Sequence, residues 1–297
     1  MPRFQAHPDV WLLVVALYGG YLYALSAWRP RAGARVPGHD AVDASGPRFA
    51  PGRRPATRSQ LTCFTLGVAA LWLAADYPIH DLGERYLYSV HMLQHMAFQL
   101  LAPPLLILGL PGWLLRRLLS PRPVAAVVRF ATRPLAALVI VNAFVAVQHT
   151  PTFVNATVRD GALHLVAHIA VVAFSLIMWW PVLSPLPELP HLSYPGRMVY
   201  LFAHSIVPTV PASFLTFTSR PLYETYASFP RIWEILDPVQ DQQLAGLLMK
   251  ILGGFFLWGV IAVLFFRWHH EEESNGPDVL YWRNLEQDLG PRELTRI

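Results

Sequence analysis

Two pairs of histidines with the same spacing are the residues of this sequence best suited to chemistry. His91 and His95 lie four residues apart, as do His164 and His168, and both pairs fall within apolar runs. In a helix this spacing places the two imidazoles of a pair on one face, one turn apart. Imidazole binds zinc, copper, iron and nickel, and polar groups inside a membrane are costly unless they serve a function. The pattern therefore predicts a metal or haem site.

Two further residues join the candidate ligands because of their positions in the chain. His149 ends one apolar run and Asp241 begins another, both on the side of the membrane where the pairs are expected. A carboxylate can complete a coordination shell or orient a ligating imidazole. Met92 and Met96 are interpreted as packing residues instead. The predicted metal ligands are His91, His95, His149, His164, His168 and Asp241.

Two other polar residues lie inside apolar runs and have no assigned chemistry. His204 is interpreted as a hydrogen-bonded packing residue beside Pro208 and Pro211, prolines that free helix carbonyls in need of partners. Lys250 is expected to be neutral, near water or paired, with Asp76 and Asp241 as candidate partners, because a charge at the bilayer centre costs about 2.5 to 3.5 kcal/mol. The remaining histidines are expected in loops or tails without a role: His7, His39, His80, His191, His269 and His270.

The amino-acid composition indicates whether water or lipid surrounds these residues. Of 297 residues, 54% are hydrophobic and 14% are charged, whereas an ordinary soluble domain has about 25% charged residues. The net charge of +4 does not indicate nucleic-acid binding, because the basic residues separate apolar runs and do not cluster with aromatic residues. The single cysteine, Cys63, excludes an internal disulfide and a zinc site of several thiolates. A membrane protein is therefore expected, with the lipid bilayer as a partner.

Seven apolar runs are close to the roughly 20 residues that cross a bilayer. Strand-like alternation is missing from them, and helices satisfy their own backbone groups in lipid. We therefore predict an all-α polytopic bundle of seven transmembrane helices, forming one domain over residues 1–297. The predicted spans are Asp9 to Trp28, Arg58 to Asp76, Tyr86 to Leu110, Pro134 to Thr150, Ala162 to Leu183, Arg197 to Ser219 and Asp241 to Trp268.

The basic residues predict the orientation of the bundle. Seventeen of the 23 lysines and arginines fall on one side of the predicted spans, and such residues are retained in the cytoplasm. The N-terminus is thus expected outside and the C-terminus in the cytoplasm, with residues 29–57 as a flexible cytoplasmic loop and 269–297 as a cytoplasmic tail. Leu114 to Arg133 is expected to form an interfacial amphipathic helix. The arginines after Ala24-Leu25-Ser26 favour a retained first helix over a cleaved signal peptide.

Several motifs are similar to those of a known family. They are His91-Met92-Leu93-Gln94-His95 with Ala102-Pro103-Pro104-Leu105 and Gly109-Leu110-Pro111, Phe202-Ala203-His204-Ser205, and Asp241-Gln242-Gln243-Leu244-Ala245-Gly246. From the second to the seventh span, the chain resembles CtaG-like multispan assembly factors of cytochrome c oxidase. The resemblance implies a multi-pass protein of the bacterial plasma (inner) membrane that handles copper for a haem-copper oxidase, with oxidase subunits as partners. It carries over His91, His95 and Asp241 as motif positions.

Three hypotheses follow for the function. The first is a chaperone that binds copper, as Cu(I), through the two histidine pairs, which the predicted orientation places in the outer leaflet, and delivers it to the oxidase. The second is a b-type haem protein for electron transfer, with one histidine of each pair as an axial ligand. The third is a metal-free scaffold for oxidase biogenesis. An enzyme is not expected, because the sequence has no phosphate-binding glycine loop, G-x-S-x-G or H-E-x-x-H motif.

Overall fold

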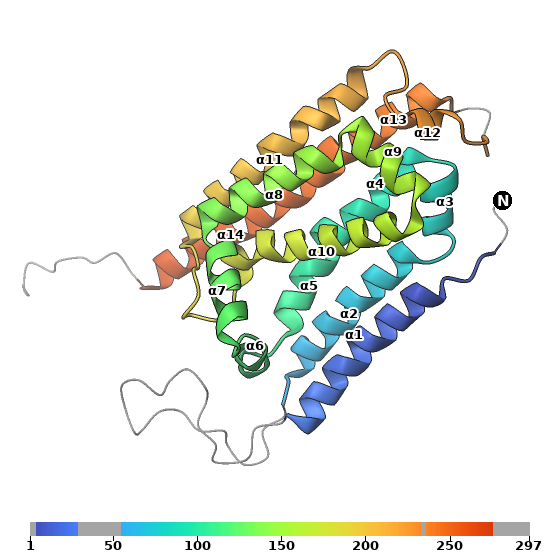
Figure 1. Cartoon of the computed structure of the whole chain (residues 1–297). Helices are drawn as coiled ribbons and strands as arrows, with labels where there is room; N and C mark the ends of the chain where they lie inside the picture. The colour runs from blue at the N-terminus through green and yellow to red at the C-terminus, as the bar shows by residue number, and fades with distance from the viewer. Residues whose placement is uncertain (1–3, 29–54, 233–235, 276–297) are drawn as a thin grey trace, which may run out of the picture.

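The described part of the chain folds into a bundle of helices (Figure 1). The computed structural model describes residues 4–28, 55–232 and 236–275, and no β-strand occurs among them. Most of the predicted loop 29–57 and of the tail 269–297 lies outside the described residues. The unbroken long helices are α1 (Pro8–Ala27), α2 (Arg58–Ala75), α8 (Pro134–Gln148), α10 (Gly161–Leu183) and α11 (Tyr194–Phe217). The predicted all-α class is confirmed for the described part.

Two further long segments change helix type along their length. The third predicted span consists of α4 (Tyr88–Met96), the π-helix η1 (Ala97–Leu101) and α5 (Ala102–Gly109). The seventh consists of α13 (Pro238–Leu247), the π-helix η2 (Leu248–Leu252) and α14 (Gly253–Asn275). π-Helical turns inside α-helices are rare and are frequent at functional sites. Each turn contributes to the buried interior, with Phe98 and Leu100 from η1 and Met249 from η2.

The helices have the lengths and surfaces of membrane spans. Five are long and apolar enough to cross a bilayer, and up to seven spans result if two bent pairs each count as one. These pairs are α2 with α3 (Ile79–Arg85), bent by 42°, and α7 (Arg122–Ala131) with α8, bent by 81°. Large apolar side chains such as Phe217 and Phe255 are 79% and 74% exposed, as expected for surfaces in contact with lipid. Five to seven apolar spans thus agree with the membrane class, and seven is the upper end of that range.

The predicted amphipathic helix from Leu114 to Arg133 is in fact two helices. They are α6 (Gly112–Leu118) and α7, joined by a short turn that contains Pro121. A proline has no amide hydrogen and clashes with the preceding helical turn, which disfavours a continuous helix, and Pro121 is the extended N-cap residue at which α7 begins. The 81° bend between α7 and α8 turns the chain from α7 into the fourth span.

The first two spans pack on one side of α5 at unusually short range. A Cβ atom on Gly109 would lie 2.5 Å from the backbone nitrogen of Phe64, so only glycine permits this approach of α2 to α5. The Tyr21 ring stacks on Phe64 at 3.7 Å, and its hydroxyl donates to the Gly109 carbonyl. This contact fixes α1 and α2 against the segment that carries the first histidine pair.

Three short helices close one end of the bundle: α3, α9 (Pro151–Arg159) and α12 (Glu224–Ala227) (Figure 1). Asn155 of α9 accepts hydrogen bonds from the backbone and hydroxyl of Thr225 in α12. The Tyr226 hydroxyl of α12 donates to the carbonyl of Gly83 in α3. The histidine pairs lie beneath this cap, at the ends of α4 and α10.

Candidate metal site

The two histidine pairs meet at the interface of α4 and α10. The His91 and His95 rings are 4.4 Å apart between centroids, and those of His164 and His168 are 4.1 Å apart, as their spacing predicts. Between the helices, His91 lies 5.7 Å from both His164 and His168, and His95 lies 5.2 Å from His168. Four imidazoles from distant parts of the sequence therefore form one contiguous group, which we call the histidine cluster.

His80 of α3 is a fifth member of the histidine cluster. Its ring lies 5.7 Å from that of His164 and 6.0 Å from that of His168. Sequence reasoning assigned His80 no role because it lies in a connection between spans. A signal was nevertheless present, because that connection was predicted on the same side of the membrane as the pairs.

The ring nitrogens of the histidine cluster fall into two groups with metal-binding geometry. In one group the ligand atoms of His80, His164 and His168 all lie within 4.8 Å of one another. In the other, the same limit holds for His91, His95 and His168. His168 belongs to both groups, and because a neutral imidazole has one nitrogen with a free lone pair, it can complete only one of them at a time. His80 Nδ1 accepts from Gln94 Nε2 and His80 Nε2 lies 3.2 Å from Glu84, so His80 must exchange one of these contacts to bind an ion. The arrangement thus suits one ion that is held by His91, His95 and His168 and passed to or from the second triad.

The histidine cluster also contains ring nitrogens that have no hydrogen-bond partner and are suited to bind a metal. His91 Nδ1, His95 Nε2 and His168 Nε2 are buried and have no hydrogen-bond partner among the described residues. Buried polar atoms nearly always have a partner, so three unpartnered nitrogens on rings whose ligand atoms lie within 4.8 Å of one another indicate a missing one. The cavity between these rings measures about 20 Å³, close to the space that one water molecule needs. A single ion matches both the donors and the space.

Glu84 supports the histidine cluster from α3. Its Oε1 lies 2.8 Å from His164 Nε2 and its Oε2 lies 3.2 Å from His80 Nε2, although the His164 ring is not aligned with the oxygen as a hydrogen bond requires. Burial alone would raise the pKa of Glu84, but the contacts with His164 and His80 outweigh it and lower the pKa well below the usual value. Glu84 is therefore an ionised carboxylate at the edge of the site, positioned to offset a cation's charge.

Asp241 lies in neither triad, because its carboxylate binds the start of α4. The two oxygens accept hydrogen bonds from the backbone of Tyr88 at 2.7 Å and of Ser89 at 3.1 Å, and from the Ser89 hydroxyl at 2.6 Å. An anion at a helix N-terminus satisfies its free amides and interacts favourably with the helix dipole. Asp241 is 1% exposed, so this contact is dry. Its position in the fold is that of a buried helix cap, one turn away from His91.

His149 also lies outside the two triads. Its Nδ1 bonds to the carbonyl of Val145 at 2.7 Å within its own helix. Its backbone carbonyl accepts a hydrogen bond from the hydroxyl of Tyr223. Burial raises the pKa of Tyr223 to about 12, partly offset by a contact with Tyr88, so this hydroxyl remains a donor. His149 thus anchors the connection before α12 to the end of α8.

The cap of short helices holds the histidine cluster at close range. A Cβ atom on Gly83 would lie 3.0 Å from the backbone of His91, so α3 approaches α4 more closely than most side chains would allow. Burial raises the pKa of Tyr226 well above its usual value, which keeps its hydroxyl protonated as the donor to Gly83. Gly83 and Tyr226 therefore position α3, and with it His80 and Glu84.

Neither of the other polar residues within spans joins the histidine cluster. His204 is 3% exposed, stacks edge-on against Tyr200 and contacts Asn142, deeper in the bundle. Lys250 is exposed on η2. The two carboxylates considered as its partners are engaged elsewhere: Asp76 accepts from two tryptophans and Asp241 caps α4.

The sequence is similar to uncharacterized proteins from mycobacteria. It is 28% identical over 237 residues to the uncharacterized protein Mb0105 of Mycobacterium bovis, covering 72% of this chain and 34% of that protein. The figures are the same for the uncharacterized protein MT0111 of Mycobacterium tuberculosis. The chain spans about a third of the length of these relatives. No solved structure matches.

Most of the chain also matches a family of assembly proteins. Residues 44–271 match the cytochrome c oxidase caa3 assembly factor family, Caa3_CtaG. The matched range contains all five members of the histidine cluster, Glu84 and the Asp241 cap. The resemblance found in the motifs is thereby confirmed: this chain belongs to the Caa3_CtaG family of cytochrome c oxidase assembly factors.

Proposed function

We propose that this assembly factor carries copper, as Cu(I), in the histidine cluster and delivers it to subunits of the oxidase in a bacterial plasma membrane. The observation that supports this most strongly is the pair of histidine triads that share His168, with ligand atoms within 4.8 Å. Neutral imidazole is a good ligand for copper. The family assembles a haem-copper enzyme, which gives such an ion a destination.

A path into the site supports a transported ion over a permanent one. The ring of His7, before α1, lies 4.8 Å from that of His80, and His7 Nε2 lies 3.0 Å from Asp81 Oδ2. His80 in turn contacts His164 and Glu84. Imidazoles and carboxylates thus lead from the end of the bundle to the buried triads, and an ion can move along them by exchanging one ligand at a time.

The same geometry favours an ion over a haem. The rings of the two pairs lie 5.2 to 5.7 Å apart across the helices, and the space between them is about 20 Å³. A porphyrin with axial ligands from both pairs would require the helices to separate. The visible spectrum of the purified protein tests the alternative of a b-type haem protein.

The metal content of the purified protein tests the proposal. The full chain is purified in detergent, loaded with Cu(I) under reducing conditions, washed, and measured for copper and for a visible haem spectrum. The wild type is expected to retain copper, and a His91→Ala/His95→Ala variant is expected to lose it. The matched control is His269→Ala/His270→Ala, which changes two exposed histidines at the end of α14.

Three results would contradict the proposal. A haem spectrum in the wild type would favour the electron-transfer hypothesis. Absence of copper from the wild type would favour a metal-free scaffold. Equal retention by the His91→Ala/His95→Ala variant would place the copper outside the histidine cluster. The scaffold hypothesis further predicts that the histidine variants leave oxidase assembly intact in cells.

A further inference from the structure

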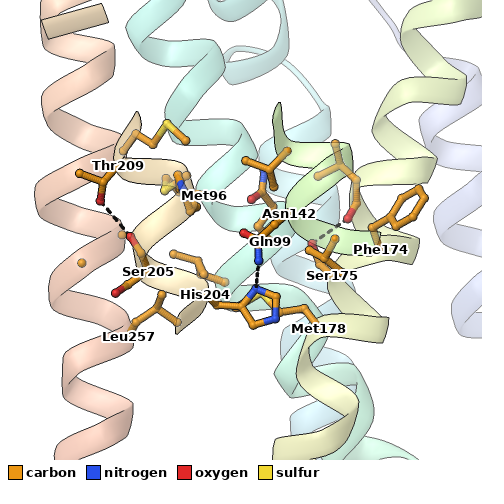
Figure 2. Close-up of a pocket in the computed structure, with 18 of the residues that line it drawn as sticks. Met96, Gln99, Asn142, Phe174, Ser175, Met178, His204, Ser205, Thr209 and Leu257 are labelled. Atoms are coloured by element: carbon orange, nitrogen blue, oxygen red, sulfur yellow. Dashed lines mark hydrogen bonds between the residues drawn. The ribbon is translucent and has the colours of Figure 1, made fainter. Parts of the chain in front are cut away.

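A second cavity lies in the middle of the bundle, beneath the histidine cluster. It measures about 260 Å³ and lies between α8, α10, α11 and the two π-helical segments (Figure 2). Gln148 and Val171 line both this space, which we call the inner cavity, and the small space between the histidines. The function proposed above does not use the inner cavity.

Three buried polar side chains face the inner cavity with bonding capacity to spare. Asn142, Gln148 and His204 are 8%, 6% and 3% exposed. Asn142 Oδ1, His204 Nε2 and both amide atoms of Gln148 have no hydrogen-bond partner among the described residues. Pro208, which also lines the cavity, lacks the amide that would bond to the carbonyl of His204. Such groups are costly to bury unpaired, so the cavity is built for an occupant that both donates and accepts hydrogen bonds.

The hydrogen bonds of Asn142 determine which atoms donate. Its Nδ2 donates to the Leu138 carbonyl at 2.8 Å and contacts His204 Nδ1 at 3.4 Å (Figure 2). Because an amide NH2 group only donates, His204 Nδ1 accepts and Nε2 carries the proton of the neutral ring. His204 therefore offers a donor to the cavity and Asn142 offers an acceptor oxygen. A metal needs a free nitrogen lone pair, so this arrangement favours a ligand with oxygen atoms over an ion.

The exposed side of the inner cavity lies along the η2–α14 segment, where Trp258 packs against Phe202 of α11. Among its lining residues the exposed ones are Lys250 and Trp258, both on η2–α14. Lys250 has no hydrogen-bond or ion-pair partner among the described residues. Phe174 lines the opposite wall, where it stacks on Phe144 at 4.3 Å between ring centroids. A ligand entering from the bilayer would pass an unpaired ammonium group and meet an aromatic wall.

Depth and size limit the class of ligand. Pro238 is the first residue of α13. At roughly 1.5 Å per residue, Lys250 lies about 18 Å from Pro238 along the helix axis. This places the mouth near the middle of a hydrocarbon layer of about 30 Å, beyond the reach of phospholipid head groups. The volume of about 260 Å³ is just below the range of about 300 to 1,000 Å³ for drug-sized ligands, which suits a single substituted ring.

We propose that the inner cavity binds the ring of a lipid-soluble quinone or its quinol. A ring carbonyl would accept from His204 Nε2 or the Gln148 amide, and a quinol hydroxyl would donate to Asn142 Oδ1. The alkyl tail would leave between α11 and α14 into the lipid. This inference is independent of copper binding, because it uses none of the residues of the two triads.

Two glycines of α14 provide a matched test. Gly254 lines the inner cavity and Gly259 does not, and a Cβ atom on either would meet no heavy atom within 4 Å. The full chain is placed in lipid nanodiscs and titrated with a benzoquinone that carries a decyl tail, with binding followed by calorimetry. The wild type and Gly259→Phe are expected to bind saturably with equal affinity. Gly254→Phe, which fills the mouth, is expected to bind at least tenfold more weakly.

A second variant removes a donor without adding bulk. His204→Leu loses the Nε2 hydrogen bond and is expected to bind roughly tenfold more weakly. The His204→Leu variant tests the proposal by itself if Gly254→Phe yields too little folded protein. Absence of saturable binding by the wild type would overturn the proposal, as would unchanged affinity in His204→Leu or in well-folded Gly254→Phe.

Copper measured on the same samples separates the two proposals. Gly254→Phe is expected to retain copper while losing the quinone, whereas His91→Ala/His95→Ala is expected to retain the quinone while losing copper. Loss of both ligands in Gly254→Phe would indicate general disruption of the bundle and would contradict the independence of the two sites.

Discussion

Removal of the Asp241 carboxylate should destabilise the bundle more than removal of any exposed helix cap. In Asp241→Ala three donors lose their partner: the amides of Tyr88 and Ser89 and the hydroxyl of Ser89. A buried donor left unpaired costs about 1 to 3 kcal/mol, and loss of the buried carboxylate's own desolvation cost offsets part of the sum. We expect a decrease of about 3 to 5 kcal/mol in the free energy of unfolding.

A milder change at the same position distinguishes a cap from a metal ligand. Asp241→Asn keeps the volume and one acceptor oxygen, so about half of that loss is expected, and the histidine cluster should stay assembled. If Asp241 only caps α4, the Asn variant retains the wild-type copper stoichiometry. If Asp241 is a ligand, as its motif position first indicated, the copper affinity falls together with the charge.

The assay compares variants by denaturant-induced unfolding in one detergent. Asp237→Ala is the matched control, because Asp237 caps the exposed start of α13 through Val239 and Gln240, and loss of such a cap typically costs about 1 kcal/mol. Ser89→Ala, which removes one of the three bonds, is expected to cost about 1 kcal/mol. The reasoning is refuted if Asp241→Ala is no more destabilising than Asp237→Ala.

Three further substitutions test how the fold positions the site. Gly83→Ala places a Cβ atom 3.0 Å from the backbone of His91, so a weaker copper affinity is expected in competition with a Cu(I) chelator; unchanged affinity would contradict a fixed α3. Glu84→Gln removes the charge beside His80 and His164 and should weaken copper binding by about 10- to 100-fold in the same assay. An unchanged copper affinity would contradict the role of Glu84 in supporting the site. Gly109→Ala would force α2 away from α5 and should lower the free energy of unfolding by about 1 to 3 kcal/mol. Thermal unfolding compares it with Gly20→Ala, a control with open space around the glycine. Equal midpoints of the two variants would refute the close packing.

Local sequence patterns predicted much of the bundle and part of the site. Apolar runs of membrane length predicted the helices, because their lengths and composition are set by the bilayer. The i,i+4 spacing predicted that His91 and His95 share a face, as do His164 and His168, because this follows from helix geometry alone. That the two pairs meet also agrees with the expected topology, which placed both at the same end of their spans.

Features that depend on contacts between distant segments could not be predicted in this way. His80 joins the cluster through the packing of α3 against α4, which no hydropathy pattern encodes. Asp241 binds backbone amides about 150 residues earlier in the chain. The residues around Asp241 in the sequence do not distinguish a helix cap from a metal-binding carboxylate. The π-helical turns at η1 and η2 are changes of hydrogen-bond register within runs that are apolar throughout, so the inner cavity they border left no trace in the sequence pattern.

The copper stoichiometry of single-histidine variants tests the central claim most directly. Because the two triads share His168, one Cu(I) per chain is expected in the wild type under reducing conditions, and none after washing in His168→Ala. His80→Ala breaks only one triad and should retain the ion in the other, with a lower affinity. A wild type without copper, or a His168→Ala variant that matches the wild type in stoichiometry and affinity, would contradict the assignment of the histidine cluster as a copper site.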